Sequence, residues 1–201
     1  MNLNKIINTP KVNVFTPKGV INKSFTGGVL YFNSMKEIKL TQGFFALVDD
    51  EDFEQMNQYS WFISKSFNTY YARTTIQKHG KQIKLMMHRE IMHAPKNMEI
   101  DHIDMNGLNN QKSNLRLCTR KQNMWNRKYI GQSKYNGVSF YYDKNGKRYI
   151  KATIRYNGKQ QYLGTFNTEE DAAMAYNNAA IIYRGEYAYL NKVQWLKEQI
   201  K

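Results

Sequence analysis

Short alternating runs of apolar and polar residues divide the first half of the chain into strands and turns. The strands predicted from these runs cover residues 37–40, 44–48, 61–63, 69–76 and 81–85. Asp49 is placed to cap an acidic helix, and residues 85–92 predict a second, short helix. Residues 1–35 have a weaker pattern and are interpreted as a leader or as short strands.

A strand, a loop, a strand and a helix are predicted between residues 98 and 127. Residues 98–103 and 115–118 predict two short strands, and the loop between them is rich in Asn and Gly. Thr119 is a favourable cap for a helix that runs to about residue 127. His102 ends the first strand and Asn123 lies on the helix, so only the folded unit brings them together.

Three more strands and a long helix are predicted after a polar link at residues 128–134. The strands cover residues 137–142, 148–156 and 160–166, and Asn-Gly pairs between them are strong hairpin signals. Thr168 and Asp171 are spaced to cap the helix, which presents a face of small residues to the sheet. The expected fold class is α+β, an N-terminal α+β region followed by a three-stranded antiparallel sheet packed on one helix.

The composition suggests a polyanionic partner. The formal net charge is +14, and Lys and Arg outnumber Asp and Glu both before and after residue 127, which favours nucleic acid. An AT-biased coding sequence rich in Lys and Asn would produce the same charge, so the motifs must decide. Cys118 is the only cysteine, which fits a reducing cytoplasm, and neither a membrane span nor a secretion signal is indicated.

The chemistry is expected around Asp101 and His102. A carboxylate beside an imidazole, with a distant amide oxygen that can close onto the same point, is what metal-assisted hydrolysis of a phosphodiester needs. Taken singly, each of these residues is better explained as part of a polar strand end or as an Asn that shapes a turn or cap. The acidic residues at 49–52 are expected to form a solvated helix start and not a second metal site.

An ordered set of motifs over some forty residues resembles the HNH, or ββα-metal, endonucleases, in particular the phage and intron-encoded homing type. The residues that carry the resemblance are His88-Arg89-x-x-Met92, Asp101-His102-Ile103-Asp104-x-Asn106-Gly107, Asn109-Asn110, Ser113-Asn114-Leu115-Arg116 and Gln122-Asn123-x-x-Asn126-Arg127. The chain departs from the commonest form at Met105, and has Asn where other HNH enzymes have a second or third His.

The resemblance implies a role for each of four residues. Asp101 and Asn123 would hold one divalent ion, His102 would be the general base, and Asn114 would orient His102. A carboxylate and an amide oxygen form a hard ligand set that suits magnesium or manganese, so zinc is not expected. The expected products carry a 5′-phosphate and a 3′-hydroxyl.

Basic residues around this site are candidate phosphate contacts. These are His88, Arg89, Arg116, Arg120, Lys121 and Arg127. For His88 and Arg89 a role in bracing the fold is the favoured alternative.

The C-terminal pattern resembles the APETALA-type, or ethylene-response-factor, DNA-binding domain. The matching residues are Tyr135-x-Gly137-Val138, Lys151-Ala152-x-Ile154, Leu163-Gly164-x-Phe166-x-Thr168-x-Glu170-Asp171-Ala172-Ala173-x-Ala175-Tyr176, Ala179-Ala180 and Leu190-Asn191. The resemblance implies a sheet that reads DNA through its outward face. That face is expected to carry Ser139, Tyr141, Lys151, Thr153, Arg155 and Gln161; the alternative is an ordinary solvated sheet face. Ile150 replaces a Trp that is frequent in plant members, so their base contacts do not carry over.

Together these features predict a site-targeted DNA endonuclease of the homing type. The expected domains are a nuclease domain at 36–127 with its core at 98–127, a linker at 128–134, a DNA-binding domain at 135–191 and a tail at 192–201. The expected partner of this monomer is double-stranded DNA, in the cytoplasm of a bacterial host if the gene is phage-encoded. A non-catalytic DNA-binding regulator is the alternative, and an RNA-binding protein is less favoured. The modular interpretation predicts that deletion of 135–201 weakens targeting and spares the chemistry.

Overall fold

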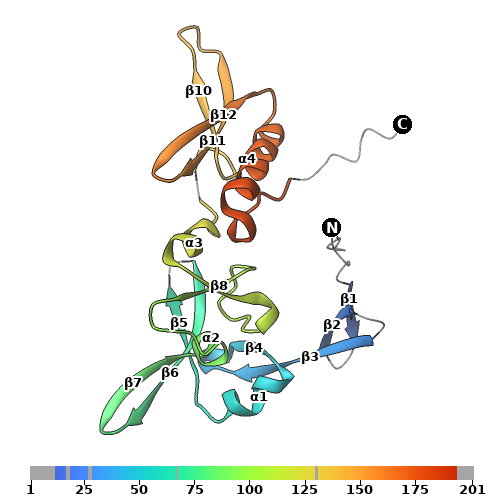
Figure 1. Ribbon diagram of the computed structural model, residues 1–201, viewed down its shortest axis with the longest axis vertical. Helices are drawn as coiled ribbons and strands as arrows, with labels where there is room; N and C mark the ends of the chain where they lie inside the picture. The colour runs from blue at the N-terminus through green and yellow to red at the C-terminus, as the bar shows by residue number, and fades with distance from the viewer. Residues whose placement is uncertain (1–11, 17–18, 27–28, 67, 130, 194–201) are drawn as a thin grey trace, which may run out of the picture. The chain divides into compact units, whose positions relative to one another are not determined.

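The computed structural model describes residues 12–16, 19–26, 29–66, 68–129 and 131–193, with side chains from residue 34 onward (Figure 1). The chain divides into two compact units, Met1–Leu117 and Cys118–Lys201. Short helices and several small antiparallel sheets confirm the predicted α+β fold class. Among the described residues, no helix combines the length and the apolar composition that a membrane crossing requires.

The first unit begins with a four-stranded sheet in the order β1-β2-β3-β4. Its strands are β1 (Val12–Thr16), β2 (Gly19–Thr26), β3 (Val29–Lys39) and β4 (Phe45–Asp49). β1, β2 and the first part of β3 occupy the stretch that was expected to be a leader or short strands, whereas residues 1–11 lie outside the described part. The 3-10 turn η1 (Thr41–Gly43) links β3 to β4 where the sequence predicts a turn.

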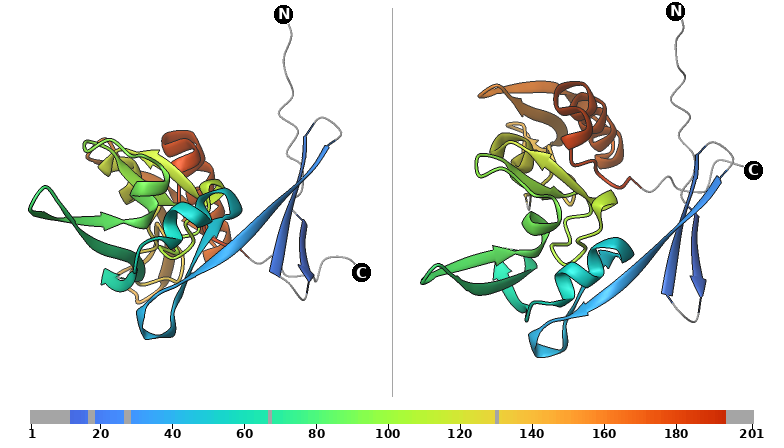
Figure 2. Two further views of the ribbon diagram at one scale, coloured as in Figure 1. Left: turned by 90° about the horizontal axis from the view of Figure 1, so that it is seen from below. Right: turned by 60° about the horizontal axis from the view of Figure 1, so that its bottom comes forward.

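A second sheet of three strands, in the order β5-β6-β7, follows helix α1 (Asp50–Asn57). Its strands are β5 (Phe62–Ser66), β6 (Thr69–Lys78) and β7 (Lys81–Met86). The predicted turn between β6 and β7 is confirmed, because His79 and Gly80 both have positive φ, at 51° and 72°. The β6–β7 hairpin projects from the rest of its unit in both views of Figure 2.

Helix α2 (Met87–Ile91) leads into the two-stranded sheet of β8 (Glu99–His102) and β9 (Leu115–Cys118). The short turn η2 (Lys112–Asn114) precedes β9. One apolar core joins these elements to the preceding strands and to α1. Its buried members are Ile38, Leu40, Ala46, Val48, Met56, Trp61, Ala72, Met87, Ile91, Ile100 and Leu115. The core fixes the end of β8 relative to α2 and β6.

The second unit contains helix α3 (Arg120–Trp125) and a three-stranded sheet covered by helix α4 (Glu169–Arg184). The strands are β10 (Val138–Tyr142), β11 (Arg148–Tyr156) and β12 (Lys159–Phe166), and the turn η3 (Gly185–Tyr187) follows α4. Thr168 caps α4 by accepting a hydrogen bond from the Asp171 backbone, as the sequence predicts. A Cβ atom on Gly137 would lie 2.0 Å from the Tyr176 ring, so this glycine permits close packing of the helix.

The division between the units differs from the predicted domain boundary. The sequence places the nuclease domain at 36–127, with a linker from 128 to 134. The compact units instead meet after Leu117, so α3 is grouped with the C-terminal sheet.

Candidate active site

Asp101 and His102 are adjacent on β8, and both side chains are buried. Neighbouring side chains on a strand point to opposite faces of the sheet. The Asp101 side chain lies on the face where Arg116 of β9 reaches it, and His102 lies against Tyr71 of β6 and His88 of α2. The Asp101 carboxylate and the His102 imidazole therefore have different neighbours, although they are adjacent at the end of β8.

Arg116 of β9 holds the Asp101 carboxylate. Its Nε and Nη2 atoms donate to Oδ2 of Asp101 over 2.8 and 2.5 Å, and both side chains are largely withdrawn from solvent. A cation bound by Asp101 would share this carboxylate with the guanidinium group. Arg116, which the sequence predicts to be a phosphate contact, is therefore paired with Asp101.

His102 lies among two rings and one amide. The centres of the Tyr71 and His88 rings are 5.7 and 5.1 Å from the centre of the His102 ring. On another side, Nε2 of His102 is 3.4 Å from Oδ1 of Asn110, which is fully buried. When Nε2 carries the ring proton and donates it to Asn110, Nδ1 has the lone pair that a general base requires.

Burial lowers the pKa of His102 below its ordinary value, and the Asn110 hydrogen bond and the carboxylates of Asp104 and Asp101 offset this effect in part. Burial also lowers the pKa of His88, to about 3, with the nearby His102 and Arg89 acting in the same direction. Both imidazoles are therefore neutral at pH 7. The neutral form is the one that can accept a proton from water.

The loop between β8 and β9 is held by its own side chains. Asn114 donates through Nδ2 to Oδ1 of Asp104 and to the Asn109 backbone carbonyl, both over 2.9 Å. Its Oδ1 accepts from the Asp104 backbone at 3.0 Å. The amide beside His102 is therefore that of Asn110, which differs from the expectation that Asn114 orients His102. The reason is that the side chain of Asn114 is used entirely in closing the loop.

Close packing explains the glycine of the motif. A Cβ atom on Gly107 would lie 2.4 Å from the Tyr70 carbonyl oxygen and 2.6 Å from the Tyr71 ring. The loop therefore lies directly against β6, the strand that supplies one of the rings around His102. The Gly107 backbone amide also donates to the Thr69 hydroxyl at 2.9 Å.

A second anchor for the loop comes from the end of β4. The Leu47 amide donates to the Leu108 carbonyl at 2.8 Å, and the Asn110 amide donates to the Leu47 carbonyl at 2.7 Å. The Asp49 carboxylate accepts from the Gln111 side chain at 3.2 Å and from the Lys112 amide at 2.7 Å. Asp49 was expected to cap α1, but its side chain makes no cap hydrogen bond there and supports the active-site loop instead.

Arg89 braces the segment before β8. Its Nη1 donates to the Met98 carbonyl at 2.9 Å, and its Nη2 donates to the carbonyls of Ala94 and Pro95 at 3.2 and 2.7 Å. His88 is buried against His102. Of the two roles left open for this pair, these contacts favour bracing over direct contact with phosphate.

The remaining site candidates on α3 lie in the second unit. Thr119 and Gln122 form a reciprocal capping box at the start of the helix, which confirms the predicted cap. Asn123 is half-buried, whereas Arg120, Lys121 and Arg127 are exposed. The helix therefore presents basic side chains to solvent and carries the amide that the motif assigns to the ion.

The donor set fits a hard cation. Asp101 offers carboxylate oxygen and Asn123 offers amide oxygen, the atoms that Mg²⁺ and Mn²⁺ prefer. Within the described residues, no three His, Cys, Asp or Glu side chains gather into a group able to hold a metal ion.

The outward face of the C-terminal sheet carries most of the residues expected there. Ser139 pairs with Lys151, and Lys151 lies 5.7 Å from the centre of the Tyr141 ring. Thr153 and Arg155 belong to the same face of β11. These five side chains therefore lie on the same face of the sheet.

Gln161 is a correction. It pairs with the buried Ile154, and residues that pair in a sheet project to the same side. Gln161 therefore belongs to the helix side of the sheet, although its side chain is exposed. Gln160 pairs with Arg155, and Tyr162 pairs with Thr153, so these two residues occupy the outward face. The register of β11 with β12 shifts between Ala152 and Thr153, next to the pair of Thr153 with Tyr162.

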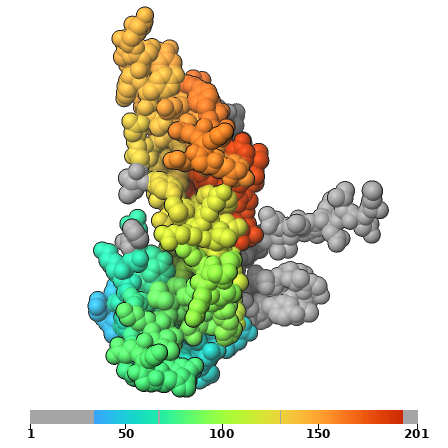
Figure 3. All heavy atoms as spheres, turned by 60° about the vertical axis from the view of Figure 1, so that its left-hand side comes forward, coloured from blue at the N-terminus to red at the C-terminus, as the bar shows by residue number. Residues whose placement is uncertain are grey.

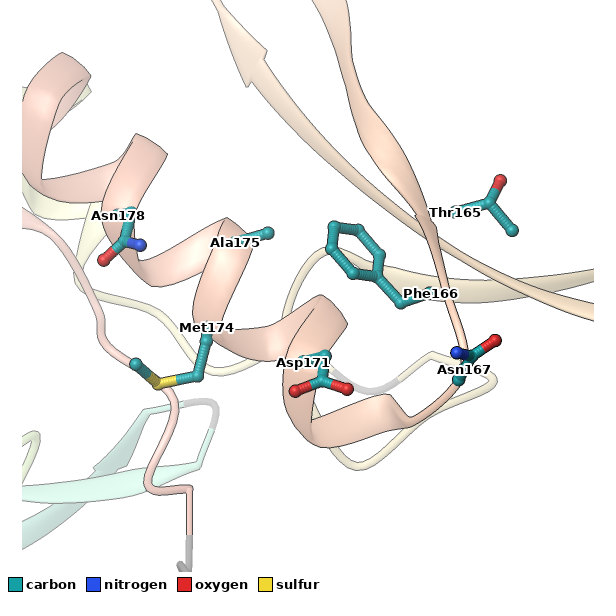
Figure 4. Close-up of a pocket in the computed structure, with 7 residues that line it drawn as sticks. All are labelled: Thr165, Phe166, Asn167, Asp171, Met174, Ala175 and Asn178. Carbon is teal, nitrogen blue, oxygen red and sulfur yellow. The ribbon is translucent and has the colours of Figure 1, made fainter.

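An open pocket of about 510 Å³ lies between β12 and α4 (Figure 4). Its lining consists of Thr165, Phe166, Asn167, Asp171, Met174, Ala175 and Asn178. None of the residues expected to take part in catalysis lines this pocket.

Comparison with known proteins identifies the nuclease motif. The family model for the HNH endonucleases matches residues 93–125, which include β8, the loop, β9 and α3. An uncharacterized HNH endonuclease of Acanthamoeba polyphaga mimivirus is 33% identical over 168 residues, which cover 83% of each chain.

Two plant proteins are similar over a shorter stretch. An ethylene-responsive transcription factor of Arabidopsis thaliana is 46% identical over 61 residues, or 30% of this chain and 14% of the plant protein. A second, AP2-like ethylene-responsive factor of the same plant is 44% identical over 61 residues, or 17% of its own length. The extended similarity to the mimivirus protein and the family match together show that this chain belongs to the HNH endonuclease family and is a nuclease.

Proposed function

We propose that the protein is a site-targeted DNA endonuclease of the homing type, with His102 as its general base. The observation that carries this proposal is the setting of His102, which is buried between Tyr71 and His88 with Nε2 directed to Asn110. This arrangement keeps the ring neutral and selects one nitrogen for proton transfer. A buried imidazole needs a hydrogen-bond partner in any role, so the assignment as base draws on this geometry together with the Asp101-His102 motif.

In the proposed reaction, Nδ1 of His102 takes a proton from a water molecule as the water oxygen bonds to phosphorus. The bond between phosphorus and the 3′ oxygen then breaks, and the 3′ oxygen takes a proton from solvent. The products are a 5′-phosphate and a 3′-hydroxyl. A bound Mg²⁺ or Mn²⁺ would polarise the phosphate and stabilise the charge on the leaving oxygen.

Asp101 and Asn123 would hold this ion, as the motif implies. Arg116 keeps the Asp101 carboxylate in a single orientation through two hydrogen bonds to Oδ2. We assign to the Asn110 amide the orienting role that the sequence gave to Asn114, because Oδ1 of Asn110 lies 3.4 Å from Nε2 of His102. Asn114 would instead maintain the shape of the loop.

Targeting is assigned to the C-terminal sheet. The similarity to the plant transcription factors and the outward basic and aromatic side chains support an APETALA-type unit bound to double-stranded DNA. The contacting residues would be Ser139, Tyr141, Lys151, Thr153 and Arg155. Arg120, Lys121 and Arg127 would bind phosphate and position the duplex without reading its sequence.

The test is cleavage of long phage or plasmid DNA by the full chain, with Mg²⁺ or Mn²⁺ and then with chelator. We expect metal-dependent cleavage, ends that ligase can rejoin, and a His102→Ala variant that binds DNA normally but cleaves at least about 100-fold more slowly. The matched control is His93→Asn, because His93 is an exposed histidine with φ of 46° and Asn tolerates that backbone.

Two outcomes would change the assignment. No cleavage by the wild-type protein with either metal would favour the non-catalytic DNA-binding regulator. Cleavage by His102→Ala at the wild-type rate would show that another group is the base.

A further inference from the structure

Helix α3 depends on packing within the second unit. It spans six residues, and a helix this short is not stable alone in water. The capping box of Thr119 and Gln122 holds its first turn. Its last turn must be held by tertiary contacts, and Trp125 is the side chain at that end.

Trp125 lies in a cluster of rings and cations. Its ring centre is 6.4 Å from that of Tyr156 and 5.9 Å from the guanidinium carbon of Arg184. Lys121, one turn earlier on α3, places its Nζ 5.4 Å from the Trp125 ring and 5.8 Å from the Tyr156 ring. The same ammonium donates to Oδ1 of Asn157 at 3.0 Å. Such cation–ring contacts are favourable when the groups are partly desolvated.

The partners of Trp125 are themselves fixed to the sheet and to α4. Tyr156 ends β11 and stacks on Tyr183 of α4, with ring centres 4.9 Å apart. Arg184 donates to the Tyr176 hydroxyl at 2.9 Å and to the Arg155 carbonyl at 3.0 Å. We call Lys121, Trp125, Tyr156, Tyr183 and Arg184 the aromatic clamp. It connects α3 to the strand whose outward face is assigned to DNA.

The segment that follows α3 is tied to the same unit. Asn136 donates to the Arg127 carbonyl at 2.7 Å and accepts from the Tyr129 amide at 2.8 Å. Asn136 also exchanges hydrogen bonds with the buried Asn191, at 2.7 and 3.0 Å. Asn191 is held in turn by Asn177 of α4. The start of the predicted linker is therefore hydrogen-bonded to the C-terminal fold, through the Arg127 carbonyl before Lys128 and the Tyr129 amide after it.

We propose that Trp125 is a positioning residue. It holds helix α3, which carries Asn123, to the C-terminal unit that reads DNA. Cleavage then depends on how that unit holds the target DNA. This inference rests on the proposed function, in which Asn123 supplies an oxygen to the ion. The sheet then has two roles, because it selects the DNA and also supports a helix that the chemistry needs. The modular expectation, that the C-terminal unit affects targeting alone, is replaced by a coupled one.

The experiment compares Trp125→Ala, Trp125→Phe and the wild-type full chain. Hydrogen exchange of residues 120–125 is measured in chelator, without metal. DNA binding is measured in the same buffer, and cleavage is then measured over a range of Mg²⁺ concentrations. For Trp125→Ala we expect α3 exchange to rise at least about ten-fold through loss of the clamp contacts.

The cleavage rate of Trp125→Ala should fall about 100-fold, because small displacements of a catalytic helix are costly. Its DNA affinity should fall much less than its cleavage rate, because the outward face is intact and Lys121, a proposed phosphate contact, keeps its hydrogen bond to Asn157. Trp125→Phe keeps a ring in the clamp and should recover most of the exchange protection and of the cleavage. Ile182→Ala is the matched control, since Ile182 is 78% exposed on α4 and lies outside the clamp.

The proposal is overturned if Trp125→Ala cleaves like the wild type, if α3 exchange is unchanged, or if binding and cleavage fall together without recovery in Trp125→Phe. If Trp125→Ala does not fold, Tyr156→Leu tests the same contact from β11, with the same expected results. An inactive wild-type protein would instead contradict the proposed function, while the exchange data would still report whether Trp125 holds α3.

Discussion

At the scale of single residues, the motif located the strand end that carries Asp101 and His102 but not what surrounds these side chains. Asp101 and His102 end β8 as expected, because a short apolar strand followed by turn residues is a local signal. The rings of Tyr71 and His88 come from β6 and α2, and their approach to His102 depends on the core beneath those elements. Asn110 was part of the motif, but only the folded loop shows that it, and not Asn114, meets His102.

The buried His88 should make stability depend on pH. Its pKa is about 3 in the folded chain and about 6.5 when the chain is unfolded, so between these values the unfolded chain binds more protons. Stability then rises with pH across this window. The contribution of the neutral, buried His88 to the free energy of unfolding is fully present above about pH 6.5 and is lost as the pH falls toward 3.

The measurement is urea unfolding of the wild type and of His88→Phe at pH 7.5 and pH 5. We expect the loss of free energy of unfolding between the two pH values to be smaller in His88→Phe. His79→Asn should keep the wild-type dependence, because His79 is exposed in a turn with positive φ. Equal pH dependence in His88→Phe and wild type would contradict the assignment.

At the scale of elements, local signals predicted the hairpin turns and two of the three helix caps, the exception being Asp49 at α1. Thr119 and Thr168 both cap the helices expected of them, and the turns at His79-Gly80 and Asn157-Gly158 have positive φ at each residue. The predicted outward position of Gln161 is wrong because the pairing of β12 with β11 shifts between Ala152 and Thr153. A bulge reverses which side chains face outward, and its mark in the sequence is Gly164, an isolated glycine within β12 that has φ of 134° and pairs with Ala152 at the shift.

The β6–β7 hairpin is an additional basic element. No Asp or Glu occurs between residues 55 and 89, and Lys78, Lys81 and Lys84 are all exposed on the two strands. The hairpin lies on the surface in the green part of the first unit (Figure 3). A two-stranded ribbon of this kind can enter a groove of DNA.

Replacing Lys78, Lys81 and Lys84 by Gln should weaken DNA binding and reduce its salt dependence. Each phosphate contact contributes about 0.9 to the slope of log affinity against log salt, so the slope should fall by up to about 3. Titrations by fluorescence anisotropy at several salt concentrations would measure it. Lys36→Gln is the control, because Lys36 is paired with Asp50 at 2.7 Å. An unchanged slope in the triple variant would exclude the hairpin from the DNA interface.

At the scale of the whole molecule, the HNH motif is distributed over both compact units. Asp101, His102 and the loop belong to the first unit, whereas Asn123 belongs to the second. The expected boundary followed the motif, which runs without interruption to Arg127. The division into compact units follows side-chain packing instead, and Trp125 of α3 packs with Tyr156 of the C-terminal sheet.

Variants on the outward face of the sheet should separate binding from chemistry. Lys151→Gln combined with Arg155→Gln removes two positive charges from β11 and leaves the aromatic clamp in place. We expect KM for a target DNA to rise about ten-fold or more through lost phosphate or base contacts, with kcat near the wild-type value. Steady-state cleavage kinetics would measure both constants. A fall in kcat at unchanged KM would place these residues in the chemistry.

The sequence by itself determined the fold class, the strands and capped helices, and the membership of an HNH motif, because these depend on contacts between residues close along the chain. Only the tertiary structure decided which amide meets His102, which face Gln161 occupies and which unit holds α3. Those features depend on packing between residues far apart in the sequence, such as Tyr71 with His102 and Trp125 with Tyr156 and Arg184. Such contacts have no spacing that a linear pattern could reveal.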